Sequence, residues 1–141
     1  MRRVVVEVRT TASPERVWHA LTEPAEVSAW DGVEPLSVPA GYPLAGQHAR
    51  WRTRAGPVPL VLHDRVTAVD AGRRLASVID VGFVHVEEEY RLAPAPGGTV
   101  LVSDNAVRAR VPGLDALAAW TARRAIEASM RRLRLHCEAA P

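Results

Sequence analysis

The chain of 141 residues contains no lysine, so all 18 of its basic residues are arginine. Catalysis through a lysine Schiff base and phosphate binding through a P-loop lysine are therefore excluded. Cys137 is the only cysteine, which rules out an intrachain disulfide and gives no sign of an oxidising compartment. No apolar run approaches the roughly 20 residues that a membrane-spanning helix needs, and the apolar stretch after Arg3 is too short for a secretory signal. We expect a cytoplasmic protein without a membrane span.

The charged residues do not form a block of one sign. They make up 24% of the chain, the formal net charge is +2, and acids are interleaved with the arginines along most of the sequence. The one dense basic stretch, residues 131–134, falls near the end of a predicted helix, where the helix dipole favours cations. These features argue against a nucleic-acid partner. The length, with 48% hydrophobic residues, fits a single domain over residues 1–141 with a sizeable core.

The first 30 residues predict one strand and two short helices. Val4, Val6 and Val8 alternate with other residues, which is the pattern of a half-buried strand. Ser13-Pro14 is a typical helix start, and apolar residues at helical spacing follow it. Thr22-Glu23-Pro24 repeats this signal and predicts a second short helix that runs to Trp30.

The middle of the chain predicts strands only, followed by one long helix. Glycine and proline divide residues 33–110 into a first short stretch after Val33 and five further strands. These five are expected at Gln47–Arg54, Pro59–Val69, Leu75–Asp80, Phe83–Leu92 and Thr99–Arg110. Turns this short join antiparallel neighbours. Leu114–Glu138 predicts a helix with a broad apolar stripe, which must pack on the concave face of the sheet. The fold class is α+β.

Three segments resemble the SRPBCC superfamily, the helix-grip group that includes START lipid-transfer domains, the birch-pollen-allergen fold and bacterial polyketide cyclases. They are Ser13–Thr22 followed by Trp30, Arg65–Asp70 before Arg73–Leu75, and Tyr90–Leu92 leading into Pro96–Thr99. The resemblance implies a helix-grip fold: a seven-stranded curved antiparallel sheet around the long C-terminal helix, with two short helices between strands 1 and 2. It also implies a mostly apolar cavity between helix and sheet, for which we expect the usual ligand-pocket volume of roughly 300–1,000 Å³.

Glu88 is the strongest candidate for acid/base chemistry. Tyr90 and Leu92 resemble the inward residues of the superfamily, and alternation along the strand then turns Glu88 inward as well. A carboxyl in an apolar cavity has a raised pKa, which suits a general acid or base near neutral pH. Alternatively, Glu88 lies hydrated at the cavity mouth or is paired with an arginine such as Arg124.

The neighbours of Glu88 on the same strand predict a solvated outer face rather than a metal site. His85, Glu87 and Glu89 share one face, but successive side chains on that face are about 6–7 Å apart, which is awkward for a single ion. The chain has no zinc-binding spacing and no glycine-rich nucleotide motif. We therefore expect no metal and no cofactor. Cys137 is interpreted as a buried small residue and not as a nucleophile.

Asp64 and Asn105 are the further catalytic candidates. Asp64 and His63 are adjacent on a strand and face opposite ways. Parity turns Asp64 inward, but a bulge common in this part of the superfamily leaves open which of the two faces the cavity. Asn105 shares parity with residues that resemble the inward set of the last strand. A buried amide needs a partner, either a ligand or a protein group such as Tyr90.

Aromatic residues supply the expected ligand surface, because the chain has few other large rings. Trp18 is interpreted as core from its helical spacing. The remaining candidates for ligand contacts are Trp30, Trp51, Tyr90 and Trp120, together with Arg124.

Three functions are compatible with these observations. The first is a cofactor-independent enzyme, similar to small polyketide cyclases and aromatases, that assists aldol closure or dehydration. The second is a carrier of a hydrophobic metabolite without catalysis, and the third is a protein-interaction module of the same fold. A cavity carboxyl with a strongly shifted pKa favours chemistry, whereas a cavity closed by packed side chains favours the third. The expected partner is a hydrophobic, aromatic or polyketide-like small molecule, and a homodimer is left open.

Overall fold

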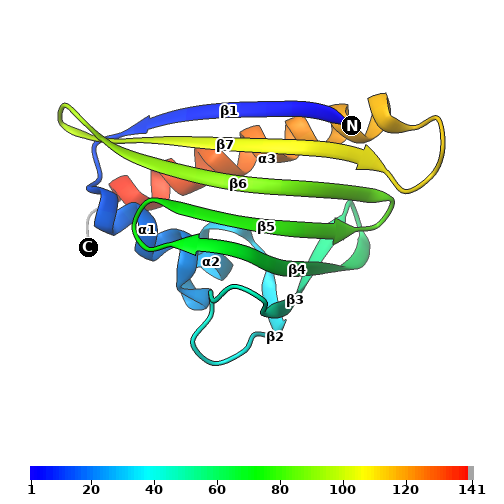
Figure 1. The fold of residues 1–141 in the computed structure, drawn as a ribbon, viewed down its shortest axis with the longest axis horizontal. Coiled ribbons are helices and arrows are strands. Elements are labelled where there is room, and N and C mark those ends of the chain that lie inside the picture. The colour runs from blue at the N-terminus through cyan, green and yellow to red at the C-terminus, as the bar shows by residue number, and fades with distance from the viewer. Residues whose placement is uncertain (140–141) are drawn as a thin grey trace.

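Seven antiparallel strands form one curved sheet in the computed structural model, which describes residues 1–139 (Figure 1). The strands are β1 (Arg2–Thr10), β2 (Glu34–Ser37), β3 (His48–Ala55), β4 (Val58–Asp70), β5 (Arg74–Val81), β6 (Val84–Ala95) and β7 (Gly98–Ala109). The helices are α1 (Pro14–Thr22), α2 (Pro24–Asp31) and α3 (Asp115–Glu138). This architecture confirms the predicted helix-grip fold, with α1 and α2 between the first two strands.

The first strand of the chain pairs with the last at one edge of the sheet. The strand order is β1-β7-β6-β5-β4-β3-β2, so the first strand pairs with the last, and Val4 lies opposite Asn105. All other neighbours are consecutive hairpins. As a result, β2 and β1 are the edges of the sheet.

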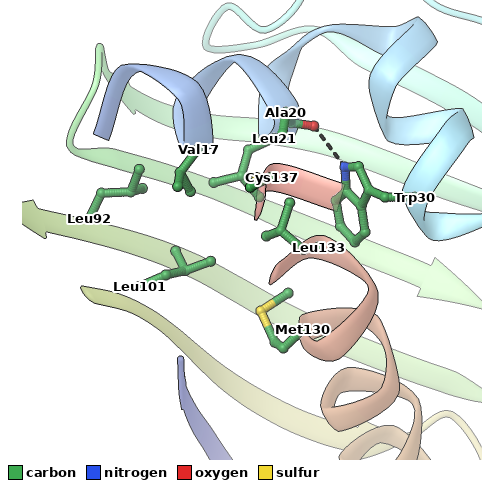
Figure 2. Close-up of a cluster of buried hydrophobic side chains, with 9 residues drawn as sticks. All are labelled: Val17, Ala20, Leu21, Trp30, Leu92, Leu101, Met130, Leu133 and Cys137. Atoms are coloured by element: carbon green, nitrogen blue, oxygen red, sulfur yellow. Dashed lines mark hydrogen bonds between the residues drawn. The ribbon is translucent and has the colours of Figure 1, made fainter. Parts of the chain in front are cut away.

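Helices α1 and α2 start where the sequence predicts. The Ser13 side chain accepts a hydrogen bond from the backbone N–H of Arg16 at 3.1 Å, and Pro14 occupies the first turn. The two helices are tied together by Trp30, whose indole N–H donates to the carbonyl of Ala20 at 2.8 Å (Figure 2). Gly32, with φ of 71°, ends α2 in the left-handed conformation that glycine adopts without strain.

Helix α3 packs on β1 and β7 rather than across the whole sheet. Its C-terminal half joins α1, α2 and the strands in a buried apolar cluster (Figure 2): Val17, Ala20, Leu21, Trp30, Leu92, Leu101, Met130, Leu133 and Cys137. The predicted stripe is exposed at its start, at Leu114 and Leu117, and also at Ala125. Its buried members are Ala118, Ala122, Met130, Leu133 and Cys137. Within residues 1–139, no helix is long and apolar enough to cross a membrane.

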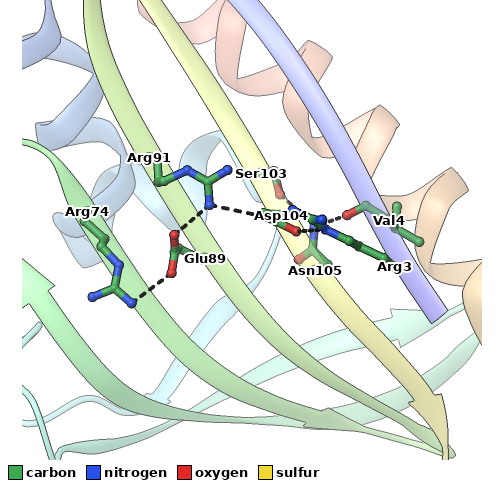
Figure 3. Close-up of polar contacts among 8 residues, drawn as sticks. All are labelled: Arg3, Val4, Arg74, Glu89, Arg91, Ser103, Asp104 and Asn105. Carbon is green, nitrogen blue, oxygen red and sulfur yellow. Dashed lines mark hydrogen bonds and ion pairs between the residues drawn. The ribbon is translucent and has the colours of Figure 1, made fainter. Parts of the chain in front are cut away.

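The outer face of the sheet carries a network of ion pairs that spans four strands (Figure 3). Glu89 accepts from Arg74 at 2.8 Å and from Arg91 at 2.7 Å, and Asp104 accepts from Arg91 and Arg3. These side chains point away from the helices, as the alternation along β6 predicts for Glu89. The residues that alternate with them along each strand therefore face the helices.

The β6–β7 hairpin brings the sheet close to the end of β1. A Cβ atom at Gly98 would lie 1.9 Å from the carbonyl oxygen of Thr10, so only glycine fits there without moving the backbone. The contact joins the hairpin to the segment that leads into α1.

Candidate functional site

A cavity of about 100 Å³ lies between α2, the loop that holds Tyr42, and the inner face of β3–β6. It is smaller than the expected 300–1,000 Å³, and no residue of α3 lines it. The expected position between α3 and the sheet is wrong because Ala118 and Ala122 of α3 are themselves buried against the apolar residues of β1, β6 and β7 and fill that half of the concave face. The half that α3 does not cover remains hollow.

Apolar and polar groups share the wall of this cavity. The aliphatic part consists of Leu21, Val27, Val33, Leu62, Leu75 and Ile79. Trp30 and Trp51 add two rings, and both are almost fully buried. Three carboxyl groups, two tyrosines and Ser77 also line it, so a cluster of polar groups lies within a wall that is otherwise apolar.

Asp64 faces the cavity and His63 does not. The register shift in the β4–β5 pair lies between Val66 and Ala68, beyond Asp64, so the alternation that turns Asp64 inward is intact. His63 is exposed on the outer face, where its ring stacks on His48 at 5.2 Å. Asp64 is only 5% exposed.

The Asp64 carboxyl is held on one side only. Its Oδ2 accepts a hydrogen bond from the Tyr42 hydroxyl at 2.5 Å and a longer one from the Trp51 indole N–H at 3.4 Å. Its Oδ1 is buried and has no hydrogen-bond partner among the described residues. Burial raises the pKa of Asp64, against the opposing effect of the Tyr42, Trp51 and Ser77 donors.

Glu88 is a half-buried residue of β6 that lines the same cavity. Burial is the main cause that raises its pKa, to about 8, and the charges of Asp64 and Asp31 act in the same direction. Hydrogen bonding with Tyr90 opposes the shift but does not cancel it. The carboxyl is therefore mostly protonated at neutral pH and can still ionise within the physiological range.

Asp31, at the end of α2, is the third carboxyl on the wall. Its Oδ1 accepts from the Ser129 hydroxyl at 2.8 Å and from Arg132 at 3.3 Å, both on α3. Burial raises the pKa of Asp31, and these two partners on α3 oppose it. Asp31 is the only one of the three acids with an arginine partner. The other two lack one, because no basic side chain lines the cavity in the described part of the chain.

Tyr42 and Tyr90 present their hydroxyl groups to the acids. Burial and the nearby Asp64 raise the pKa of Tyr42, and burial together with Glu88 raises that of Tyr90. Both phenols therefore stay protonated and act as hydrogen-bond donors. Tyr42 also meets the Trp51 ring edge-on, with centroids 6.1 Å apart.

Asn105 does not line the cavity, contrary to the prediction. Its side chain is fully buried, and its Nδ2 donates to the carbonyl of Val4 at 3.2 Å and to Ser103 at 3.0 Å. The reason is the position of β7 under α3, where the inner face is packed and no hollow remains. The partners of the Asn105 Nδ2 are therefore protein groups and not a ligand (Figure 3).

Trp120 and Arg124 also lie outside the cavity. Trp120 is 58% exposed near the start of α3, and the guanidinium of Arg124 lies over its ring, 5.1 Å from the centroid. Neither residue lines the cavity, because the face of α3 that carries them is turned to solvent. Trp30, Trp51 and Tyr90, by contrast, do line the cavity.

The cavity thus brings together two of the predicted catalytic candidates, Glu88 and Asp64, with two residues that sequence reasoning missed. Asp31 and Tyr42 come from a helix end and an irregular loop, where no periodic pattern indicates which way a side chain points. Elsewhere, within residues 1–139, no group of three potential ligands could hold a metal ion. Chemically, the arrangement can bind a small molecule against aromatic rings and move a proton through a carboxyl.

Comparisons with known proteins agree with this fold. The family described as polyketide cyclase / dehydrase and lipid transport matches residues 1–138. The comparison with curated proteins finds no match.

Three solved structures illustrate the structural likeness. Protein CV1439 from Chromobacterium violaceum shares 18% identity with a TM-score of 0.79, over 99% of this chain and 100% of that one. A START superfamily protein from Mycobacterium smegmatis shares 15% identity with a TM-score of 0.79, over 96% and 97%. DynU16, a protein in the dynemicin biosynthetic locus, shares 22% identity with a TM-score of 0.66, over 93% of this chain and 46% of that one. At these identities the likeness shows the fold.

Proposed function

This chain belongs to the polyketide cyclase / dehydrase and lipid transport family, and from that premise we propose that its cavity binds a small hydrophobic molecule and that Glu88 moves a proton to or from it. The family supports hydrophobic ligand binding in general. The observation that carries the proton-transfer step is the Glu88 carboxyl, which lines the cavity with a pKa raised to about 8. A group with this pKa is available as acid and as base near neutral pH.

The volume of the cavity limits what it can hold. An apolar cavity of about 150 Å³ accommodates a benzene-sized molecule, and this cavity measures about 100 Å³. A long lipid chain does not fit. The proposed ligand is a small ring or short chain, or the reacting part of a larger molecule whose remainder lies outside.

The proposed chemistry is proton transfer next to a carbonyl group. The ionised Glu88 carboxylate takes a proton from the carbon beside a carbonyl, and the resulting enolate attacks a second carbonyl carbon of the same molecule to close a ring. The new alkoxide then takes that proton back from the neutral Glu88 carboxyl, so no oxidant or reductant is required. For dehydration, the Glu88 carboxylate removes the remaining proton from the same carbon, the hydroxyl group on the neighbouring carbon leaves with that proton as water, and a carbon–carbon double bond forms. Tyr42 and Tyr90 are donors that can orient the carbonyl oxygen.

Exchange of the α-protons of cyclopentanone in D₂O tests this proposal with a small cyclic ketone. We expect the protein to accelerate exchange, as followed by NMR, with a rate that rises with pH and levels off above about pH 8, because the base form of Glu88 is the active one. Glu88→Gln should lower the rate by about 100-fold or more while cyclopentanone still binds.

Glu87→Gln is the matched control, because Glu87 is the exposed neighbour of Glu88 on the outer side of the same strand. It should leave exchange unchanged. Binding of cyclopentanone without accelerated exchange would make the protein a carrier and refute the catalytic role. Absence of any binding would overturn the proposed function as a whole.

A further inference from the structure

The donors and acceptors on the cavity wall are out of balance. The indole N–H of Trp30 donates to a backbone carbonyl. The indole N–H of Trp51 and the hydroxyl of Tyr42 both donate to one oxygen of Asp64. The Tyr90 hydroxyl is a hydrogen-bonding partner that lowers the pKa of Glu88, and the Ser77 hydroxyl has the same effect on the pKa of Asp64. Every side-chain donor on the wall is thus directed at a protein acceptor. Three carboxyl groups supply more acceptor oxygens than these donors satisfy.

The unsatisfied acceptor lies on the most deeply buried of the three acids. Asp64 is 95% buried, as its exposed fraction of 5% shows, and its Oδ1 lacks any hydrogen-bond partner among the described residues. A buried carboxylate oxygen without a partner is costly, and a native structure that keeps one usually places a ligand or water against it. What would complement Oδ1 is an N–H or O–H donor from inside the cavity.

The acids on the cavity wall favour a donor that carries a positive charge. Asp31 has a partner in Arg132, but neither Asp64 nor Glu88 has a basic side chain beside it. The rings of Trp51, Trp30 and the two tyrosines face the same hollow, and the faces of aromatic rings attract cations. Acceptor oxygens, acids without a basic partner and aromatic rings together form the surroundings that an organic ammonium group prefers.

We infer that this cavity takes a small apolar molecule that carries a protonated primary or secondary amine, with an ammonium N–H directed at Asp64 Oδ1 and the apolar body against the tryptophan rings. The inference rests on the proposed function, since it names the ligand class for the same cavity. An amine with an alkyl body is protonated at neutral pH, as the lysine side chain is.

Binding of such a cation should displace protons from the carboxyl groups. The charged or titratable groups that face Glu88 are Asp64 on β4, Asp31 on α2 with its partner Arg132 on α3, Tyr42 in the loop and Tyr90 on the same strand. His48 on β3 acts on Asp64 from the outer face. The acids raise the pKa of one another, and an ammonium between them removes that repulsion. Glu88 then ionises and releases its proton to solvent.

Three ligands that share one ring test the inference: cyclopentylamine, cyclopentanol and cyclopentanone. At pH 7, we expect cyclopentylammonium to bind at least 10-fold more tightly than cyclopentanol, as measured by calorimetry or by tryptophan fluorescence. Asp64→Asn removes the charge and should abolish this preference, so that the variant binds the amine and the alcohol with affinities within about 2-fold of each other. Asp80→Asn is the control, because Asp80 lies outside the cavity beside His85.

Calorimetry of the unaltered protein keeps the test independent of whether the Asp64 variant folds. The heat of cyclopentylamine binding should change with the ionisation enthalpy of the buffer, because protons are released, and the heat of cyclopentanol binding should not. Equal affinity for the amine and the alcohol, tightest binding of the ketone, or absence of proton release would overturn the inference and leave the proposed function standing. If none of the three molecules binds, the proposed function fails with it.

Discussion

Glu88 and Asn105 lie directly opposite each other on neighbouring strands, yet their surroundings differ. The Glu88 side chain lines the hollow between α2 and the sheet, where it meets two other acids. Asn105 is one strand closer to β1, where its Nδ2 donates to Val4 and Ser103 and its buried Oδ1 has no hydrogen-bond partner among the described residues. A separation of one strand therefore decides whether a polar inward residue lines the cavity or holds the sheet together.

Replacement of Asn105 tests its structural role. Asn105→Ala leaves the carbonyl of Val4 without this donor and should lower the free energy of unfolding by about 1–3 kcal/mol, measured by chemical denaturation. The affinity for cyclopentanone should not change. Thr121→Ala, which removes an exposed hydroxyl on α3, is the control and should alter stability by less than about 0.5 kcal/mol. Unchanged stability together with weakened binding would return Asn105 to the ligand site.

At the scale of the helices, one carboxylate joins all three. Glu26 on α2 contacts Arg16 and His19 on α1, and its Oε1 lies 2.8 Å from His136 Nε2 on α3. Burial raises the pKa of Glu26, but hydrogen bonds from His136, Arg16 and His19 outweigh it and lower the pKa to about 2. The cluster fixes α2, which carries Trp30 and Asp31 into the cavity.

The stability that Glu26 contributes should depend on pH. Its pKa falls from about 4.5 in the unfolded chain to about 2 in the folded one. Since the folded pKa is the lower one, the contribution is complete above about pH 4.5 and is lost as the pH falls toward 2. Glu26→Gln should lower the free energy of unfolding by on the order of 2 kcal/mol at pH 6, reduced from the full shift because Arg16 and His19 are solvated.

The difference between the two proteins should shrink as the pH is lowered from 4.5. Glu127→Gln is suited as a control, because Glu127 forms an exposed pair with Arg123 on the surface of α3 at 3.7 Å. It should show little change at any pH. A Glu26→Gln effect that stays constant down to pH 2.5 would contradict this account of the cluster.

At the scale of the whole molecule, stability is expected to be uneven across the sheet. β6 and β7 have a partner on both sides, and α3 covers β7 and β1. β2 has only four residues, all exposed, and forms one edge next to β3. The cavity also lies on the β3–β6 half. The half that contains the cavity is therefore the half that α3 does not pack against.

Hydrogen exchange can measure this asymmetry. Backbone amides of β6 and β7 should exchange slowest, at rates that report global unfolding, and those of β2 should exchange fastest, through local opening. Cyclopentanone should slow exchange in β3, β4 and α2 more than in β1. Uniform protection across all seven strands, or slowing confined to β1 and β7, would place the binding region elsewhere.

The amino-acid sequence by itself determined the elements and the faces of most strands. Alternation along β6, counted from residues that resemble the inward set of the superfamily, turned Glu88 inward, because a strand has only two faces. Parity favoured the same face for Asp64, but a possible bulge left the choice between Asp64 and His63 to the tertiary structure. Ser13 and Pro14 located the start of α1, since a helix needs an N-cap wherever it begins. These signals are local, and the tertiary structure did not alter them.

Only the tertiary structure decided where the cavity lies and which residues line it. The pairing of β1 with β7 brings residues about 100 positions apart into contact, and it draws α3 to that side of the sheet. Parity gave the correct inward face for Asn105, but it does not specify what covers that face. Trp120 was a ligand candidate only as one of the few aromatic rings, and its position on the solvent side of α3 depends on how that helix packs. Tyr42 and Asp31 enter the cavity from a loop and a helix end, where no period relates the sequence to a direction. The site depends on long-range packing, and local pattern carries no information about that.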